Sequence, residues 1–510
     1  MEKKVNIEKE LQLAKKYKKN NNIDAAREIY TKVLELHPNS KKAKQGLKSL
    51  SSDNNRTKST SIDLSMEQQN QLVSLYQSNR IEDAIKETSR LIGLYPKHPF
   101  LYNFLGLCFQ SIGQNQNAIN SFIKSLEIKP DYFEGYYNLG NLLKSMGNTD
   151  KAIVAYEEAL KIEPRNSTIL KELGNIKDFS QDNQRIQFIL DIYKNTKDAQ
   201  EQIEFGYILF KIADKLGQYD NAFQFLEKSN HLKLKTSNYD VDDHISYIEN
   251  VKSLFENSDI ENIKTSTNDN SKNKTIFIVG MPRSGTTLTE QILASHNDVT
   301  ALGEQNFMTT MINNLIQNNK EKIVIKDIQN IQELYLKEQS KLGSYNTKYL
   351  TDKTPHNFIY IGFILLAFPN AKIINLSRDP IANAWSLYKT YFTADGLGYS
   401  YDFDDIAEFY KVYTDIFEFY NEKFPDQIYT LKYESLVEDQ ETATKDLLAY
   451  CELEWEDSCM EFYNTTRAIS TASSQQVRKS IYDDSLSEWK NYKEDLKPLI
   501  QSLEEQGVIS

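Results

Sequence analysis

The chain has 510 residues, 40% of them hydrophobic, which is enough for two or three domains that each bury a core. Its formal net charge of −12 excludes a general nucleic-acid binder, because such proteins present a basic surface. An anionic ligand would therefore need a pocket that is basic locally.

The sequence gives no sign of a membrane segment or a metal centre. It lacks an apolar run of about eighteen residues, and its charged start, MEKKVNIEKELQ, differs from a signal peptide. The three cysteines, Cys108, Cys451 and Cys459, have neither metal-ligand spacing nor a disulfide framework. We therefore expect a cytoplasmic protein without a membrane span, with reduced and buried thiols.

The N-terminal half is expected to be a helical repeat array. Pro96, Pro130 and Pro164 lie 34 residues apart, with small or apolar residues at matching positions before each. This pattern resembles the tetratricopeptide repeat, in which pairs of helices stack into a solenoid. Residues 11–38 look like an earlier unit, and 204–231 like a degenerate later one. We expect repeats over 1–50, a polar linker over 51–64, complete and degenerate repeats over 65–257, a second linker over 264–274 and another domain over 275–510.

From Thr275 onward, short apolar runs alternate with helix-like segments, which predicts an α/β fold with a central parallel sheet. The expected strands are Thr275–Gly280, Val299–Leu302, Lys348–Thr351, Ala371–Ser377 and Gln427–Tyr433. A distinctive polar residue follows or closes each strand: Arg283, Glu304, Lys353, Arg378 and Tyr433. Because ligands bind at the carboxyl ends of parallel strands, these five side chains should converge on one crevice.

The first of these strands runs into PRSGTTL, 282–288, a loop of glycine and hydroxyl residues that opens a helix. Such a loop directs backbone N–H groups at an anion. It is P-loop-like, but Thr286 stands where the lysine of a Walker A motif would follow Gly285. The nearest cation is Arg283, whose planar fork suits an oxyanion. The loop therefore predicts a site for a phosphate-like group.

The C-terminal half resembles sulfotransferases that use 3′-phosphoadenosine 5′-phosphosulfate (PAPS). Within that superfamily it is most similar to the tyrosylprotein sulfotransferases and to bacterial tetratricopeptide-repeat sulfotransferases. The motifs that carry the resemblance are PRSGTTL (282–288), GE (303–304), DK-x-P (352–355), SRDP…S (377–386) and S-S-Q-Q-V…L-S-x-W (473–489).

The resemblance implies a role for each motif. The loop would bind the 5′-phosphosulfate, and Arg378 with Ser386 the 3′-phosphate. Glu304 would be the catalytic base, with His296 and His356 as alternative bases. The implied cofactor-binding residues are Pro282, Arg283, Ser284, Gly285, Thr286, Thr287, Arg378, Ser386, Tyr433, Ser474, Arg478 and Lys479.

Two further residues complete the implied catalytic set with Glu304 and Arg283. Lys353 would stabilise charge on the bridging oxygen as the sulfuryl group leaves. Ser473 would act in the transition state, within a segment that closes over the nucleotide. The sequence departs from the tyrosylprotein pattern at Thr390, where a second arginine is expected, and at Glu488, where a lysine is expected. Lys389 or Arg478 could substitute for the missing cations.

The sequence thus predicts an all-α tetratricopeptide solenoid fused to a P-loop-like α/β sulfotransferase domain. The enzyme would move a sulfuryl group from PAPS to a hydroxyl acceptor, with a protein tyrosine as one candidate, and release adenosine 3′,5′-bisphosphate without a metal. The repeats would recruit a polypeptide. The alternative is a repeat scaffold whose sulfotransferase-like domain is inactive. An ATP-dependent kinase is disfavoured by the missing Walker lysine.

Overall fold

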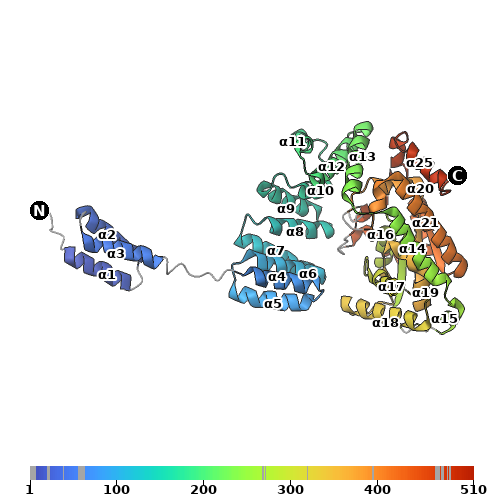
Figure 1. Ribbon diagram of the computed structural model, residues 1–510, viewed down its shortest axis with the longest axis horizontal. Coiled ribbons are helices and arrows are strands. Elements are labelled where there is room, and N and C mark those ends of the chain that lie inside the picture. The colour runs from blue at the N-terminus through green and yellow to red at the C-terminus, as the bar shows by residue number, and fades with distance from the viewer. Residues whose placement is uncertain are drawn as a thin grey trace. The chain divides into compact units, whose positions relative to one another are not determined.

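The computed structural model describes residues 7–19, 23–37, 40–54, 64–266, 269, 271–318, 320–392, 396–465, 471, 476–478, 480–481 and 484–510 (Figure 1). The chain divides into two compact units, Met1–Cys108 and Phe109–Ser510, and each is described by itself.

The first unit consists of helices whose small residues allow close packing. In α1–α3, the ring of Tyr30 takes the space that a side chain at Gly46 would fill. In α4, Ser65 caps the helix by accepting a hydrogen bond from the Gln68 N–H at 3.1 Å. The helices are α1 (Ile7–Lys19), α2 (Ile23–Leu36), α3 (Lys41–Asn54), α4 (Met66–Gln77), α5 (Ile81–Leu94) and α6 (Pro99–Ser111), whose last residues belong to the second unit.

The second unit begins with further helical hairpins. Gly147 and Gly217 have positive φ angles of 77° and 69°, and each lies in the short turn between two helices. Pro130 and Pro164 follow the ends of α7 and α9, in agreement with the predicted repeats. The helices are α7 (Asn115–Ile128), α8 (Phe133–Ser145), α9 (Thr149–Ile162), α10 (Ser167–Gly174), α11 (Asn183–Asn195), α12 (Ala199–Lys215), α13 (Tyr219–Thr236), α14 (Val241–Glu256) and α15 (Ile260–Ser266).

An α/β domain follows, built on one parallel sheet of order β2-β3-β1-β4-β5. The five predicted strands are confirmed, and every strand end lies within one residue of its predicted position. The strands are β1 (Lys274–Gly280), β2 (Val299–Ala301), β3 (Tyr349–Asp352), β4 (Lys372–Ser377) and β5 (Ile428–Lys432). Because β1 lies at the centre, the loops after β3, β1 and β4 are neighbours at the carboxyl edge.

Helices cover the sheet and its edge. They are α16 (Thr286–Ala294), α17 (Phe307–Gln317), α18 (Ile325–Leu342), α19 (Ile361–Ala367), α20 (Pro380–Tyr388), α21 (Phe403–Lys423), α22 (Tyr433–Glu438), α23 (Gln440–Tyr450), α24 (Asp484–Ser487) and α25 (Lys497–Glu505). Short 3₁₀ turns connect them at Pro355–Tyr360, Gly398–Tyr401, Asp457–Cys459, Phe462–Asn464, Gln476–Arg478 and Glu488–Tyr492.

The last repeat helices share a core with the α/β domain. Buried apolar side chains of α12, α13 and α14 belong to the same cluster as those of β1, α19 and α21, and Figure 1 shows α14 beside α21. The Phe255 ring of α14 lies 5.6 Å from Phe363 and 5.5 Å from Tyr420, between ring centroids. A side chain at Gly362 would meet the rings of Phe255 and Tyr420 at 2.5 Å. The polar stretch Lys264–Lys274 therefore does not separate two independent cores.

No helix in the described part of the chain is long and apolar enough to cross a membrane. The three cysteines are buried free thiols, as expected. Burial raises the pKa of Cys108 and of Cys451 to about 12, so both are inert thiols at neutral pH.

We predict that Phe255→Ala lowers the free energy of unfolding of residues 109–510 by about 3–5 kcal/mol, since it empties a site in the shared core. Urea denaturation measures the change. The control is Phe188→Ala on α11, where the ring is 39% exposed and the expected change is within about 0.5 kcal/mol. Equal changes in the two variants would contradict a core shared by α14 and the sheet.

Candidate active site

The loop between β1 and α16 has the backbone geometry of an anion-binding turn. Arg283 and Gly285 have φ angles of 69° and 110°, both in the left-handed region. A side chain at Gly285 would lie 2.7 Å from the Tyr433 ring, so only glycine fits there. No described side chain caps α16, which leaves its first N–H groups for a ligand.

The Ser284 hydroxyl is buried inside this loop. The residue is 1% exposed, and its Oγ has no hydrogen-bond partner among the described residues. A buried polar group without a partner costs about 1–3 kcal/mol. The hydroxyl and the uncapped helix therefore fit an oxyanion group bound in the loop.

The residues predicted to hold the second phosphate are joined to this loop. Asp379 caps α20, which leaves Arg378 at the exit of β4 and Ser386 farther along the helix. The Nε of Arg283 donates to the Ser386 Oγ at 3.2 Å. Arg378 donates from Nη1 to the Arg283 carbonyl at 2.9 Å, and its guanidinium carbon lies 4.8 Å from the centre of the Tyr433 ring. The two predicted phosphate sites are therefore adjacent.

The predicted base and its neighbour form an ion pair at the same edge of the sheet. The Lys353 side chain is completely buried and contacts the carboxylate of Glu304, whose side chain is 49% exposed. Backbone bonds hold the pair in place: the Lys353 N–H donates to the Gly303 carbonyl at 2.9 Å. The buried Glu290 carboxylate accepts from the Gly303 N–H at 3.0 Å and from Thr351 Oγ1 at 2.8 Å. The loop after β2 is thereby tied to the end of β3.

The two alternative bases are placed less favourably. Burial and the neighbouring His244 lower the pKa of His356 to about 3, and its Nε2 lies 3.1 Å from the Tyr399 hydroxyl. The His296 Nε2 lies 3.0 Å from the Glu454 carbonyl, and the residue does not line the cavity. Glu304 is therefore better placed as a base than either histidine.

These groups surround a cavity of about 1480 Å³. The predicted residues that line it are Pro282, Arg283, Gly285, Thr286, Thr287, Glu304, Arg378, Ser386 and Tyr433, together with the alternative base His356 and the substitute cation Lys389. Ser284 and Lys353 are buried next to lining residues. Ser473, Ser474 and Lys479 lie outside the described residues. Within the described part of the chain, no group of three or more His, Cys, Asp or Glu side chains is placed to hold a metal ion.

The two cations considered as substitutes are both engaged elsewhere. Arg478 donates from Nη1 to the Thr465 carbonyl at 2.9 Å and from Nη2 to the carbonyl of Ser145, at the end of α8. Lys389 pairs with the Glu488 carboxylate. Arg478 is thus turned toward the repeats, and Glu488, one of the two departures, neutralises Lys389.

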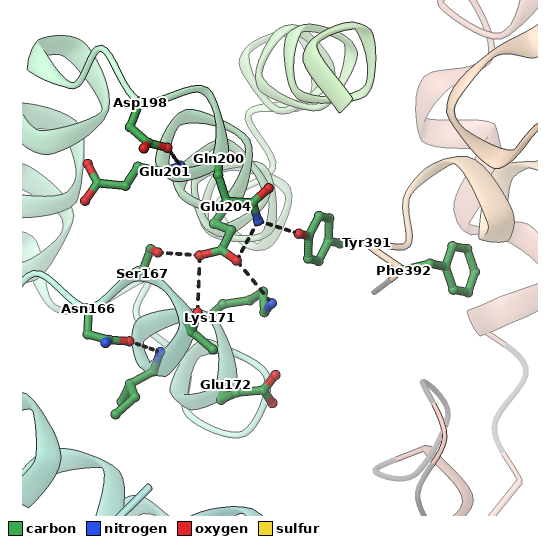
Figure 2. Close-up of polar contacts among 12 residues, drawn as sticks. Asn166, Ser167, Lys171, Glu172, Asp198, Gln200, Glu201, Glu204, Tyr391 and Phe392 are labelled. Carbon is green, nitrogen blue, oxygen red and sulfur yellow. Dashed lines mark hydrogen bonds and ion pairs between the residues drawn. The ribbon is translucent and has the colours of Figure 1, made fainter. Parts of the chain in front are cut away.

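Sequence reasoning missed the second wall of the cavity, which the repeats provide. Residues of α8, α10 and α12 line it, among them Tyr137, Asn141, Lys144, Lys171, Tyr207 and Lys211. Across the cavity wall, the Gln200 amide donates to the Tyr391 hydroxyl at 2.7 Å (Figure 2). No motif marks these residues, because the repeat pattern predicts pairs of helices but does not indicate which other part of the chain the helices contact.

Known protein families match parts of both the N-terminal and the C-terminal half of the chain. Residues 275–457 match the family described as "Sulfotransferase family", and residues 10–40, 106–147 and 133–166 match tetratricopeptide repeat families. An uncharacterized protein of Aquifex aeolicus (strain VF5) is 35% identical over 356 residues, which cover 66% of this chain and 46% of that protein. The protein-tyrosine sulfotransferase of Drosophila melanogaster is 25% identical over 236 residues, which cover 42% of this chain and 46% of that enzyme.

Protein-tyrosine sulfotransferase 1 of Danio rerio is 26% identical over 236 residues, which cover 42% of this chain and 65% of that enzyme. Among solved structures, the sulfotransferase domain from the Synechococcus PCC 7002 olefin synthase is 19% identical, with a TM-score of 0.34; the match covers 43% of this chain and 89% of that domain. The chain spans less than half the length of the Aquifex and Drosophila relatives.

The half-buried His356 predicts a specific acid sensitivity. Because its pKa in the folded chain is lowered to about 3, its contribution to stability is present above the ordinary value near 6.5 and is lost as the pH falls toward 3. Between about pH 7 and pH 5 this group should cost about 2 kcal/mol of unfolding free energy. In His356→Gln, the unfolding free energy measured by urea denaturation should fall by correspondingly less between pH 7 and pH 5. The control, His231→Gln at an exposed position, should keep the slope of the unmodified chain; a shared slope in all three would refute the assignment.

Proposed function

Because a sulfotransferase-family domain follows tetratricopeptide repeats in this chain, we propose that the protein transfers a sulfuryl group from PAPS to a hydroxyl group of an acceptor. The observation that supports this proposal most is the meeting of Arg283, Arg378 and Ser386 at one cavity with the Glu304 carboxylate. A surface salt bridge or a packing turn would not require these groups to face a common space.

The residues present fit the nucleotide in two places. The Ser284 hydroxyl and the first N–H groups of α16 would hold the 5′-phosphosulfate. Arg378 and Ser386 would hold the 3′-phosphate, and Arg283, which donates to Ser386, would lie between the two sites. PAPS, when bound, supplies the sulfuryl group and adenosine 3′,5′-bisphosphate as its leaving group.

The chain's own contribution to the reaction centres on Glu304. Its carboxylate would take the proton of the acceptor hydroxyl as the bond from the acceptor oxygen to sulfur forms and the bond from sulfur to the phosphate oxygen breaks. The buried Lys353 would orient this carboxylate and offer positive charge near the developing negative charge. His356 is the weaker candidate, because a group with a pKa of about 3 accepts a proton poorly at neutral pH.

The acceptor that we propose is a polypeptide recruited by the repeats, with tyrosine as the first hydroxyl to test. The relatives named protein-tyrosine sulfotransferases support this choice. The reaction as proposed uses no metal ion. A cytoplasmic location fits the buried free thiols, since that compartment keeps thiols reduced.

The cofactor proposal predicts discrimination between nucleotides. Adenosine 3′,5′-bisphosphate should raise the melting temperature of the full chain, and ATP at the same concentration should not, because ATP lacks the 3′-phosphate for Arg378 and Ser386. Arg378→Met should abolish most of the shift. Equal shifts with both nucleotides, or a requirement for magnesium, would favour the kinase alternative.

The mechanism predicts a separation of binding from turnover. Glu304→Gln should keep the melting shift with adenosine 3′,5′-bisphosphate and lose turnover by roughly a hundredfold or more, the usual scale of general-base catalysis. Transfer of label from radioactive PAPS to a tyrosine peptide measures the rate. Glu321→Gln, at an exposed site before α18, is the control and should keep full activity. A fully active Glu304→Gln enzyme would place the base elsewhere.

A further inference from the structure

The cavity has an excess of positive charge that the proposed nucleotide residues do not account for. Among the residues that the structure describes, eight lysine and arginine side chains line it, against five carboxylates, although the whole chain carries a net charge of −12. Only Arg283 and Arg378 belong to the predicted nucleotide site. Of the remaining six, five come from the repeats: Lys144, Lys171, Lys177, Lys211 and Lys215.

Three of these lysines converge from three helices on one carboxylate, Glu172. Lys144 of α8 forms an ion pair with it. Burial opposes ionisation of Glu172, but Lys144, and then Lys171 and Lys211, lower its pKa below the ordinary value. Glu172 thus pairs with Lys144 and lies within electrostatic reach of the Lys171 and Lys211 ammonium groups.

Lys171 is held within the wall by other contacts. Its side chain is 10% exposed, and its Nζ lies 3.8 Å from the buried Glu204 carboxylate and 4.4 Å from the centre of the Tyr391 ring (Figure 2). Glu204 also accepts from the Gln200 amide at 3.0 Å. Lys171 is thus oriented by α12 and by the segment after α20, so its position depends on both halves of the unit.

Lys211 differs from the other two, because among the described residues no carboxylate lies within ion-pair distance of it. Its amine donates to the Asn175 side-chain oxygen, and the residue is exposed toward the cavity. Although the residue is solvent-accessible in the cavity, the surrounding protein atoms partly desolvate its amine and, with Lys171, Lys144 and Lys389, lower the pKa of Lys211 to about 8, which Glu172 only partly opposes. Four amines thus lie near one another on this wall, and an anion among them would lessen their mutual repulsion.

A purely solubilising role does not explain this arrangement. Surface lysines of the repeats pair with acids one turn away on the same helix, as Lys124 does with Glu127 and Lys161 with Glu158. Lys144, Lys171 and Lys211 instead come from α8, α10 and α12 and line a common space. Such convergence is characteristic of binding sites for charged ligands.

We propose that Lys211, flanked by Lys144 and Lys171, forms an oxyanion-binding site on the repeat wall of the cavity. Its ligand is a phosphate, sulfate or carboxylate group, brought either by the nucleotide or by the acceptor. The role of this site in turnover rests on the proposed sulfuryl transfer, whereas the binding of an oxyanion does not. The nucleotide is a credible source, because Thr390 replaces an expected arginine and Glu488 neutralises Lys389.

The experiment uses the full chain and two probes, inorganic pyrophosphate and adenosine 3′,5′-bisphosphate, with adenosine 5′-phosphate as the comparison ligand that lacks the 3′-phosphate; calorimetry measures the affinities. Lys211→Met should weaken at least one probe about tenfold, the scale of one lost charge-assisted hydrogen bond. Lys211→Arg should keep the affinity. Lys151→Met, at an exposed position on α9 that does not line the cavity, is the matched control.

The pattern of losses identifies the source of the anion. Weaker bisphosphate binding with unchanged binding of adenosine 5′-phosphate assigns the site to the 3′-phosphate of the nucleotide. The site is assigned to the acceptor if pyrophosphate still binds when the bisphosphate is saturating and if Lys211→Met lowers that pyrophosphate affinity. If the chain binds no bisphosphate at all, Lys211-dependent pyrophosphate binding still supports the site while the proposed function fails. Unchanged affinity for both probes in Lys211→Met overturns the proposal.

The pH dependence of probe affinity distinguishes a ligand-binding lysine from one with a structural role only. The groups facing Lys211 are Glu172 and Lys171 of α10, Lys144 of α8 and Lys389 after α20. Because the Lys211 amine loses its proton as the pH rises through about 8, probe affinity should fall between about pH 7 and pH 9. In Lys211→Arg, whose guanidinium stays charged, this fall should be smaller. Parallel falls in the two proteins would overturn the assignment to Lys211.

Discussion

The apolar packing of α12–α14 against the α/β domain determines where the other parts of this unit lie. Phe255 packs into a space that Gly362 leaves open, and Asn230 of α13 donates to the Tyr388 carbonyl at 2.9 Å. Since this core is continuous with β1, the last helical hairpins cannot move independently of the strand that leads into the anion loop. The last helical hairpins are therefore part of the structure that forms the cavity.

This packing gives the cavity two chemically different walls. The sheet edge supplies the loop amides, Arg283 and the pair Glu304–Lys353, all of which come from the ends of strands. The repeats supply lysines and aromatic residues from α8, α10 and α12. In a chain that is acidic overall, lysine and arginine side chains thus outnumber carboxylates among the described residues that line this cavity.

Polar contacts reinforce the connection between the walls. Tyr391 follows the helix that carries Ser386. Its hydroxyl accepts a hydrogen bond from the Gln200 amide, and its ring faces the Lys171 amine. Arg478, from the C-terminal segment, reaches the end of α8 at Ser145. Direct contacts therefore join the helical wall to groups beside the proposed nucleotide site.

The sequence by itself determined the elements whose signals are local. Apolar runs marked all five strands, Asp379 before a proline marked the start of α20, and PRSGTTL marked the loop, since turns and caps depend on neighbours along the chain. The convergence of Arg283, Glu304 and Arg378 followed from parallel-strand topology. Spacing could not reveal which surfaces would meet across long separations. Tertiary structure alone decided that Lys389 pairs with Glu488, that Arg478 turns to Ser145 and that the repeat lysines face the loop, because each contact joins residues about a hundred or more positions apart.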